Sequence, residues 1–313
     1  MKTVLCLGLT PALQRTMLFD RLEVDEVNRA RQVVESAAGK ALNTARVLAR
    51  LGTPAQTAGF NGGQTGRVIA GFLKAYGVVS ALTPMRADTR ICSTLIDAAT
   101  GTVTELVEEA REPGRAAVAR FVKDNLKRAR GAAMLVISGT LPPYAGDDFY
   151  VGFVRAAAEA GVPVVIDSHK AALVNVLFER PLLAKLTVRE LATTLQEPMN
   201  SEGRILRGMR DLLKMGAQNV FVTQGAKPAY LVTAKQAWRF SPPQLARHVN
   251  PIGSGDCATA GIAHALLAGK RVRDSVRYGL ACGSANVESL TPADLDLKRV
   301  AVLQRGVRSE ALV

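Results

Sequence analysis

The chain has 313 residues, 48% hydrophobic and 21% charged, without a low-complexity tract or an internal repeat. These values are typical of a globular enzyme or binding protein and exclude a disordered or fibrous chain. The excess of 40 Lys and Arg over 27 Asp and Glu gives a formal charge of +13, which favours an anionic partner. Because aromatic residues make up only 5% and the basic residues are dispersed, we expect no specific nucleic-acid binding.

The cysteines and the first residues bear on compartment and membrane attachment. The four cysteines lie far apart, without metal-ligand spacing, at Cys6, Cys92, Cys257 and Cys282. Such cysteines are typical of reduced, buried thiols in a cytoplasmic protein. The opening MKTVLCLGL is apolar but has no small-residue cleavage site, so we interpret it as a buried first strand. No apolar run approaches the ~18 residues that suggest a membrane span, and we expect no membrane association.

Strand and helix patterns alternate along the first half of the chain. Residues 15–36 alternate apolar and polar residues, which predicts short strands exposed on one face. The next expected elements, in chain order, are a helix over 39–51, a strand over 55–60, a helix over 64–76, a strand over 78–82, a hairpin over 91–106 and a helix over 115–130. This rhythm predicts an α/β fold.

Four short segments in the second half are almost entirely apolar, at 133–137, 162–166, 182–186 and 219–223. Strands that are apolar on both faces belong to a parallel sheet covered by helices on both sides. Two helices, about 255–267 and 273–288, are expected to close the fold. Because no linker-like stretch interrupts the chain, residues 1–313 are interpreted as a single domain with its chemistry at the carboxyl edge of the sheet.

The strongest motif is NPIGSGDCATAG, at residues 250–261. Gly253 and Gly255 precede a helix of small residues whose first turn contains Asp256. A glycine-rich turn at a helix start exposes backbone N–H groups and the positive end of the helix dipole, which suits phosphate oxygens. Asp256 beside this anion hole is a candidate base for a hydroxyl that attacks a phosphoryl group. Taken alone, the segment also fits an ordinary loop with a carboxylate at a helix N-terminus.

Two other nucleotide-binding motifs are disfavoured by their context. Residues 253–258 formally match the GxGxxA dinucleotide fingerprint, which should follow the first strand of a βαβ unit. Here the match lies near the C-terminal end, after Pro251, and only helices are expected beyond it. A Walker A loop is absent, because Ala41 follows Gly39-Lys40 and Val34 stands where the first glycine belongs.

The motif NPIGSGDCATAG resembles the C-terminal signature of the PfkB/ribokinase family of carbohydrate kinases, and AAGKALNTARVLARLG (37–52) resembles its N-terminal signature. The most similar branch contains 1-phosphofructokinase and tagatose-6-phosphate kinase. The resemblance implies a ribokinase-like three-layer α/β/α sandwich with a mainly parallel central sheet and a small β lid, formed by about 11–36 and 86–107. It also implies a cytoplasmic kinase that uses ATP and Mg²⁺ and that forms a homodimer through the lid, as many relatives do.

The resemblance assigns roles to individual residues. Asp256 is the base, and Gly253, Ser254 and Gly255 form the anion hole. The implied substrate contacts are Gln14, Gly39, Lys40, Asn43, Arg90, Ser138 and Gly139. The implied nucleotide contacts are Thr187, Glu190, Thr223, Gly225, Lys227, Gly283 and Asn286. Glu190 would order magnesium indirectly, through water, because the ion keeps much of its hydration shell. Asp167 is interpreted as structural.

The sugar end of the site departs from the pattern of this branch. The branch more often shows Asn, Asp, Asn, Gly and Asn where this sequence has Thr10, Gln14, Cys92, Tyr144 and Thr187, and Leu186 replaces a proline. Gln14, in the sugar-binding TPALQ turn, exchanges a carboxylate for an amide that donates as well as accepts hydrogen bonds. The preferred sugar is therefore expected to differ from the ketohexose phosphates usual in the branch.

The leading hypothesis is ATP-dependent phosphorylation of a sugar phosphate, either fructose 1-phosphate, tagatose 6-phosphate or a related ketose phosphate. Lys40 and Arg90 together favour it, because two cations would face a neutral acceptor otherwise. A kinase for an unphosphorylated sugar or nucleoside is one alternative, and a catalytically weak sugar-phosphate sensor is another. The retention of Asp256 and its glycines disfavours the sensor.

Overall fold

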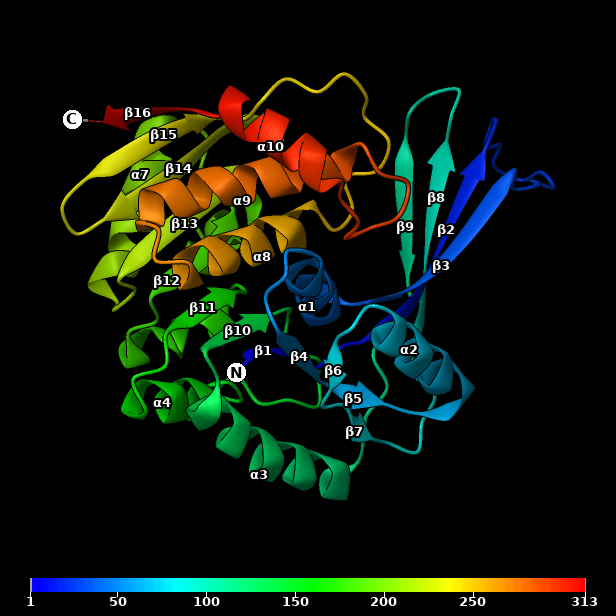
Figure 1. The fold of residues 1–313 in the computed structure, drawn as a ribbon, viewed down its shortest axis with the longest axis horizontal. Helices are drawn as coiled ribbons and strands as arrows, with labels where there is room; N and C mark the ends of the chain where they lie inside the picture. Colours follow the sequence, from blue (N-terminus) through cyan, green and yellow to red (C-terminus); the bar gives the residue numbers. More distant parts are fainter. Residues whose placement is uncertain (1, 313) are drawn as a thin grey trace.

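A ten-stranded main sheet forms the centre of the structure, a computed structural model that describes residues 2–312 (Figure 1). Its strands lie in the spatial order β16 (Arg308–Leu312), β15 (Ala237–Ser241), β14 (Lys227–Thr233), β13 (Asn219–Gln224), β12 (Leu183–Thr187), β11 (Val164–Asp167), β10 (Met134–Ser138), β1 (Val4–Leu7), β4 (Ala55–Ala58) and β6 (Val79–Ser80). Neighbours from β13 to β6 are parallel, whereas β13 to β16 pair antiparallel. The four apolar segments thus became the parallel strands β10 to β13.

Helices cover both faces of this sheet. Strand β1 shows the division, because Val4 and Cys6 join one core cluster and Leu5 and Leu7 join the other, as the period-2 geometry of a strand requires. The first cluster packs under α1 (Lys40–Arg50), α2 (Gly63–Ala75), α8 (Ser254–Leu267), α9 (Val272–Val287) and α10 (Leu297–Gly306). The second packs under α3 (Arg115–Gly131), α4 (Val151–Glu159), α5 (Ala171–Val174), the 3₁₀ turn Leu177–Glu179, α6 (Val188–Leu195) and α7 (Glu202–Lys214). The predicted three-layer α/β/α class is confirmed.

A separate four-stranded sheet stands beside the sandwich, at the upper right of Figure 1, and is called the lid. Its strands, in spatial order, are β3 (Gln32–Ala38), β2 (Ala12–Phe19), β8 (Ile91–Asp97) and β9 (Val103–Val107). Strand β2 runs antiparallel to β3 and parallel to β8, and α2 packs beneath β2 and β3. Gln14 therefore lies within a strand, not in the turn that the TPALQ segment predicted.

Two expectations about elements are wrong. The chain does not close on two helices after residue 254, because α10 and the edge strand β16 follow α9. Strand β16 is mostly exposed and exists by pairing with β15, so its sequence carries no apolar pattern.

The strand expected over 55–60 is divided into β4 and β5 (Phe60–Asn61), and β5 pairs with β7 (Thr83–Pro84). The division falls at Gly59, where a Cβ would lie 2.6 Å from the Gly8 carbonyl oxygen.

Among residues 2–312, no helix has both the length and the apolar character that crossing a membrane demands.

Gly39 is the residue whose conformation sets the start of α1, and with it the position of Lys40. Its φ is +105°, and a Cβ there would lie 2.9 Å from the Thr10 carbonyl oxygen. We expect Gly39→Ala to lower the free energy of unfolding by ~1–3 kcal/mol, since it combines strain with a clash. Urea unfolding measures this change.

Gly71→Ala is the matched control, because Gly71 lies inside α2 with nothing within 4 Å of a built Cβ. It should stabilise the protein by ~0.5–1 kcal/mol, the helix preference of Ala over Gly. Equal stability of Gly39→Ala and the wild type would show that the α1 start adapts without cost.

Candidate active site

A cleft of about 480 Å³ lies between the carboxyl edge of the main sheet and the lid. It is lined by the start of α1, the ends of β11 and β12, the start of α8 and the lid strands β2, β8 and β9. The predicted site residues that line it are Gln14, Gly39, Lys40, Asn43, Arg90, Gly139, Thr187, Glu190, Gly253, Gly255 and Asp256. The structure thus brings together residues that are more than 240 positions apart in the chain.

The glycine turn before α8 has the geometry of an anion site. Gly253 has a φ of +83°, and a Cβ there would lie 2.7 Å from the Ala293 nitrogen, so only glycine fits. Ser254 donates its N–H to the Pro251 carbonyl, at 3.1 Å. Within the described residues, the N–H groups of Gly255 and Asp256 donate to no protein acceptor. Unpartnered N–H groups at a helix start favour a bound anion.

Asp256, in the first turn of α8, is 5% exposed. Asn43 of α1 donates its amide Nδ2 to Asp256 Oδ2, at 2.7 Å. Burial raises the pKa of Asp256 to about 6, against the opposing charge of Lys40. A carboxylate with this pKa is ionised at neutral pH and still able to take up a proton, as a general base must be.

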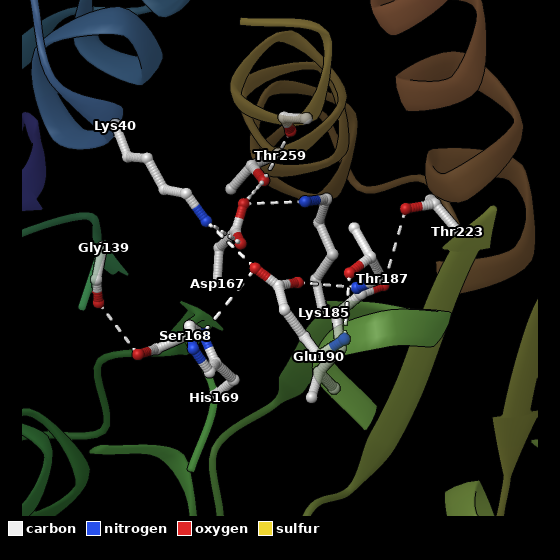
Figure 2. Close-up of polar contacts among 12 residues, drawn as sticks. Lys40, Gly139, Asp167, Ser168, His169, Lys185, Thr187, Glu190, Thr223 and Thr259 are labelled. Atoms are coloured by element: carbon white, nitrogen blue, oxygen red, sulfur yellow. Dashed lines mark hydrogen bonds and ion pairs between the residues drawn. The ribbon is translucent and has the colours of Figure 1, made fainter. Parts of the chain in front are cut away.

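A buried charge network lies beneath the turn (Figure 2). Asp167 Oδ2 accepts hydrogen bonds from Lys185 Nζ at 2.7 Å and from Thr259 Oγ1 at 2.8 Å. Asp167 and Lys185 have side chains only 1% and 2% exposed, and they are direct partners in the register of β11 and β12. Although burial acts to raise it, the ammonium groups of Lys185 and Lys40 hold the pKa of Asp167 well below its usual value. Asp167 therefore stays ionised.

Lys185 is the site residue that sequence reasoning missed. A Cβ built on Gly255 would lie 3.3 Å from Lys185 Nζ, so the ammonium is next to the glycine turn. The sequence carried a signal, because a lysine in an otherwise apolar strand needs a buried carboxylate. Asp167 ends the neighbouring strand, but only the register of β11 with β12 pairs the two residues.

Lys40 points toward the same network (Figure 2). Its Nζ lies 3.5 Å from Asp167 Oδ1 and 3.4 Å from Glu190 Oε1. The charge of Asp167 raises the pKa of Lys40, against the opposing effect of burial. The substrate contact predicted for Lys40 stays a prediction, since Lys40 lines the cleft while its ammonium is near two carboxylates.

Glu190 is held by a capping box at the start of α6. Glu190 Oε2 accepts the N–H of Thr187 at 2.7 Å, and Thr187 Oγ1 accepts the N–H of Glu190 at 3.1 Å. Burial acts to raise the pKa of Glu190, but Lys40 and the Thr187 N–H outweigh it and lower the pKa. Thr187, a departure from the branch pattern, thus binds one carboxylate oxygen of Glu190, and the other oxygen is paired with Lys40.

The described residues contain no group of three or more His, Cys, Asp or Glu side chains able to hold a metal ion. Magnesium needs no such cage when phosphates and water supply most of its ligands. Glu190 lines the cleft with its Oε1 3.4 Å from Lys40 Nζ, and the indirect magnesium role that the sequence predicted for it stays a prediction.

The lid end of the cleft carries charges of both signs. Arg90 donates Nη1 to the Glu108 carbonyl and Nη2 to the Thr10 carbonyl, both at 3.0 Å. Glu105 lines the cleft beside Arg90. Gln14 lines the cleft, is 3% exposed and donates one N–H of Nε2 to Thr94 Oγ1 of β8 at 2.8 Å.

The remaining predicted residues lie outside the lining of the cleft. Ser138 is buried at the end of β10, and Thr223 donates to the Leu186 carbonyl at 3.5 Å. Gly225, with a φ of +59°, and the exposed Lys227 belong to the tight turn between β13 and β14. Three others pack in or under the glycine turn: Ser254, Gly283 and Asn286.

Gly283 and Asn286 of α9 lie against the turn rather than on the cleft. A Cβ on Gly283 would lie 2.8 Å from the Ser254 carbonyl oxygen, and Asn286 is fully buried. The nucleotide contacts predicted for these two residues stay predictions.

Comparisons with known proteins agree with this architecture. The family model described as "pfkB family carbohydrate kinase" matches residues 1–297 of this chain. Phosphofructokinase-2 from Escherichia coli, in complex with fructose-6-phosphate, is 23% identical with a TM-score of 0.87, over 97% of this chain and 99% of that one. A Thermotoga maritima protein described as a possible 1-phosphofructokinase is 21% identical with a TM-score of 0.91, over 99% and 100%. A carbohydrate kinase from Agrobacterium tumefaciens is 20% identical with a TM-score of 0.76, over 100% of both chains.

The Asp167–Lys185 pair gives a prediction about stability. Lys185→Met removes one partner and leaves the ionised Asp167 buried, which should lower the free energy of unfolding by ~3–5 kcal/mol at pH 7. Urea unfolding of the purified variant measures the loss.

Two variants serve as controls. Lys270→Met changes an exposed lysine and should shift the free energy by less than ~0.5 kcal/mol. Adding Asp167→Asn to Lys185→Met should recover much of the loss, because no buried charge is then unpaired. A loss below about 1 kcal/mol for Lys185→Met would mean that Thr259 and Lys40 alone compensate Asp167.

Proposed function

The chain belongs to the PfkB family of carbohydrate kinases, and from this premise we propose that it phosphorylates a sugar bound between Asp256 and the lid, with Asp256 as the general base. Family membership makes the protein an ATP-dependent sugar kinase. The identity of the base and the class of the acceptor are the parts that the geometry of the cleft supports.

The observation that carries the proposal is the place of Asp256 beside the unpartnered N–H groups of the glycine turn. An acceptor hydroxyl next to Asp256 gives its proton to the carboxylate as its oxygen bonds to the γ-phosphorus of ATP. The bond from that phosphorus to the bridging oxygen breaks, and ADP leaves with this oxygen. The N–H groups of the turn and the Lys185 ammonium stabilise the negative charge on the oxygens of the transferred phosphoryl group. Kinases usually stabilise phosphoryl transfer in this way.

Lys40, Glu190 and Asp167 have roles at the same end of the cleft. Lys40 lies between the two carboxylates and keeps both ionised. Magnesium, when bound, would neutralise charge on the ATP phosphates, and Glu190 is the residue that would hold its water shell. Nucleotide contacts at Thr187, Thr223, Gly225 and Lys227 remain part of the proposal.

For the acceptor, we propose a sugar phosphate whose phosphate lies at the lid end, near Arg90. The fructose-6-phosphate complex of the similar Escherichia coli phosphofructokinase-2 supports this class. A second candidate, an unphosphorylated sugar, is favoured by one observation: Glu105 and Glu109 line the cleft at the same end as Arg90. A phosphate there would meet two carboxylates as well as one guanidinium.

Assembly and compartment are also proposals. Val33 and Leu106 on the lid strands are 46% and 54% exposed, which supports a homodimer formed through the lid. The four cysteines are all free and buried, which supports a reducing, cytoplasmic compartment.

Asp256→Asn tests the base directly. The amide cannot accept the hydroxyl proton, so kcat should fall by ~10²-fold or more, with the KM for ATP little changed. Because a buried charge is removed, the melting temperature at pH 8 should not decrease. The measurement is ADP release with a panel of phosphorylated and free sugars.

The pH dependence is the control for this assignment. Because the raised pKa is about 6, the kcat/KM of the wild type should fall tenfold per pH unit below that value, as Asp256 becomes protonated. The residual activity of Asp256→Asn should lack this acid limb. An identical limb in both proteins would assign the titration to another group and remove Asp256 from the mechanism.

Arg90→Ala and Glu105→Gln separate the two acceptor classes. For a phosphorylated sugar, loss of a charge-assisted contact of ~1.5–3 kcal/mol should raise KM about tenfold to a hundredfold in Arg90→Ala. Glu105→Gln should lower KM for the same sugar, because a repulsive carboxylate is removed. Steady-state kinetics on matched pairs of sugars and their phosphates gives both values.

Arg86→Ala is the matched control, since Arg86 is an exposed arginine that does not line the cleft. It should leave KM unchanged. A wild type that prefers free sugars, with Arg90→Ala affecting both members of each pair equally, would exclude the sugar phosphate and select the second candidate.

A further inference from the structure

The glycine turn is held from below by one side chain of α9, the amide of Asn286. Its Nδ2 lies 2.8 Å from the Ile252 carbonyl oxygen, 3.1 Å from Ser254 Oγ and 3.4 Å from the Asn250 carbonyl oxygen. Its Oδ1 accepts from the thiol of Cys257, at 3.5 Å. Both ends of this amide are therefore used on the segment that carries the anion site.

The orientation of the amide follows from its partners. Two of the three groups around Nδ2 are carbonyl oxygens, which only accept hydrogen bonds, so the NH₂ end must face them. The reverse orientation would place Oδ1 against both carbonyls in a site with no access to water, since Asn286 is fully buried.

This orientation dictates the direction of the hydrogen bond to Ser254. An amide nitrogen has no acceptor capacity, so Ser254 Oγ accepts from Asn286 and keeps its own proton. Within the described residues, no protein group accepts that proton. Ser254 stands between Gly253 and Gly255, which both line the cleft.

We propose that Asn286 is a positioning residue, which fixes the turn and leaves the hydroxyl proton of Ser254 free for an oxygen of the transferred phosphoryl group. The proposal rests on the proposed function, in which this turn receives that group. Ser254 then adds a side-chain donor to the backbone donors of Gly255 and Asp256. Gly283, one turn earlier on α9, allows the approach, because any Cβ there would lie 2.8 Å from the Ser254 carbonyl oxygen.

Asn286→Asp reverses this hydrogen bond while keeping the shape of the side chain. A carboxylate has no N–H to give, so Ser254 would have to donate its proton to Asp at position 286 and would lose it as a donor to a ligand. We expect kcat to fall at least tenfold, with the KM for ATP changed less than threefold. Asn286→Ala and Ser254→Ala should each lower kcat about tenfold, the size of one hydrogen bond to a charged group.

The double variant Ser254→Ala/Asn286→Ala tests whether Asn286 acts through Ser254. Its kcat should be no lower than that of the worse single variant, because both changes remove the same donor. Multiplying effects would mean that Asn286 acts independently of Ser254 and would overturn the proposal.

Asn125→Ala is the matched control for the loss of a buried amide. Asn125 is fully buried in α3 and donates Nδ2 to the Phe121 carbonyl at 2.9 Å, away from the cleft. It should lower the melting temperature without changing kcat. An Asn286→Ala protein that behaves the same way, with kcat unchanged, would reduce Asn286 to a structural residue.

Binding of ADP with tetrafluoroaluminate, a planar mimic of the transferred group, separates this proposal from the proposed function. Calorimetry should show tighter binding than ADP alone in the wild type, and about a tenfold loss of that gain in Ser254→Ala, a small change at a half-buried residue. A gain that Ser254→Ala loses, without turnover of any sugar, would refute the function and support the role of Ser254. A gain that Ser254→Ala leaves intact would overturn the proposal even if the wild type is an active kinase.

Discussion

The buried ion pair between Asp167 and Lys185 is the interaction on which the site depends. It joins β11 to β12 at the carboxyl edge of the sheet, and Thr259 connects the same carboxylate to α8. Lys40 adds α1 to the network. Four elements that are far apart in the chain are thus fixed around one carboxylate. Because an unpaired charge in this position would be strongly unfavourable, the pair also specifies how the elements meet.

Two aspartates in the same cleft have opposite proton affinities because their surroundings differ. Asp167 has two ammonium groups nearby and stays ionised, whereas Asp256 is buried with an amide as its closest partner and has a pKa of about 6. The separation of the two pKa values suits Asp167 to a permanent charge and Asp256 to the proton acceptor that we propose, a pattern found where two carboxylates share a catalytic site. Lys40 supports both residues, since its charge keeps the carboxylates ionised.

The cleft is electrostatically divided. Its sheet end contains the ammonium groups of Lys40 and Lys185 and the helix start, which suits the triphosphate side of the reaction. Its lid end has Arg90 among Glu105 and Glu109 and the amide of Gln14. The proposed chemistry of phosphoryl transfer therefore lies at the sandwich end of the cleft, and the proposed recognition of the acceptor lies at the lid end, along β2, β8 and β9. Three departures from the branch pattern, Thr10, Gln14 and Cys92, line the cleft at the lid end, and Thr187 lines it at the sheet end.

The sequence alone determined the α/β class, the parallel strands β10 to β13 and the glycine turn with Asp256, because apolar runs and glycine-rich helix starts are local patterns. The tertiary structure decided the rest. Strand β16 is defined only by pairing with β15, and the partnership of Lys185 with Asp167 only by the register of their strands. Lys40 lines the cleft, as the sequence predicted, and only the packing shows that its ammonium also lies near Asp167 and Glu190. Pairings between distant residues leave no local pattern, since they arise from how strands and helices align in space.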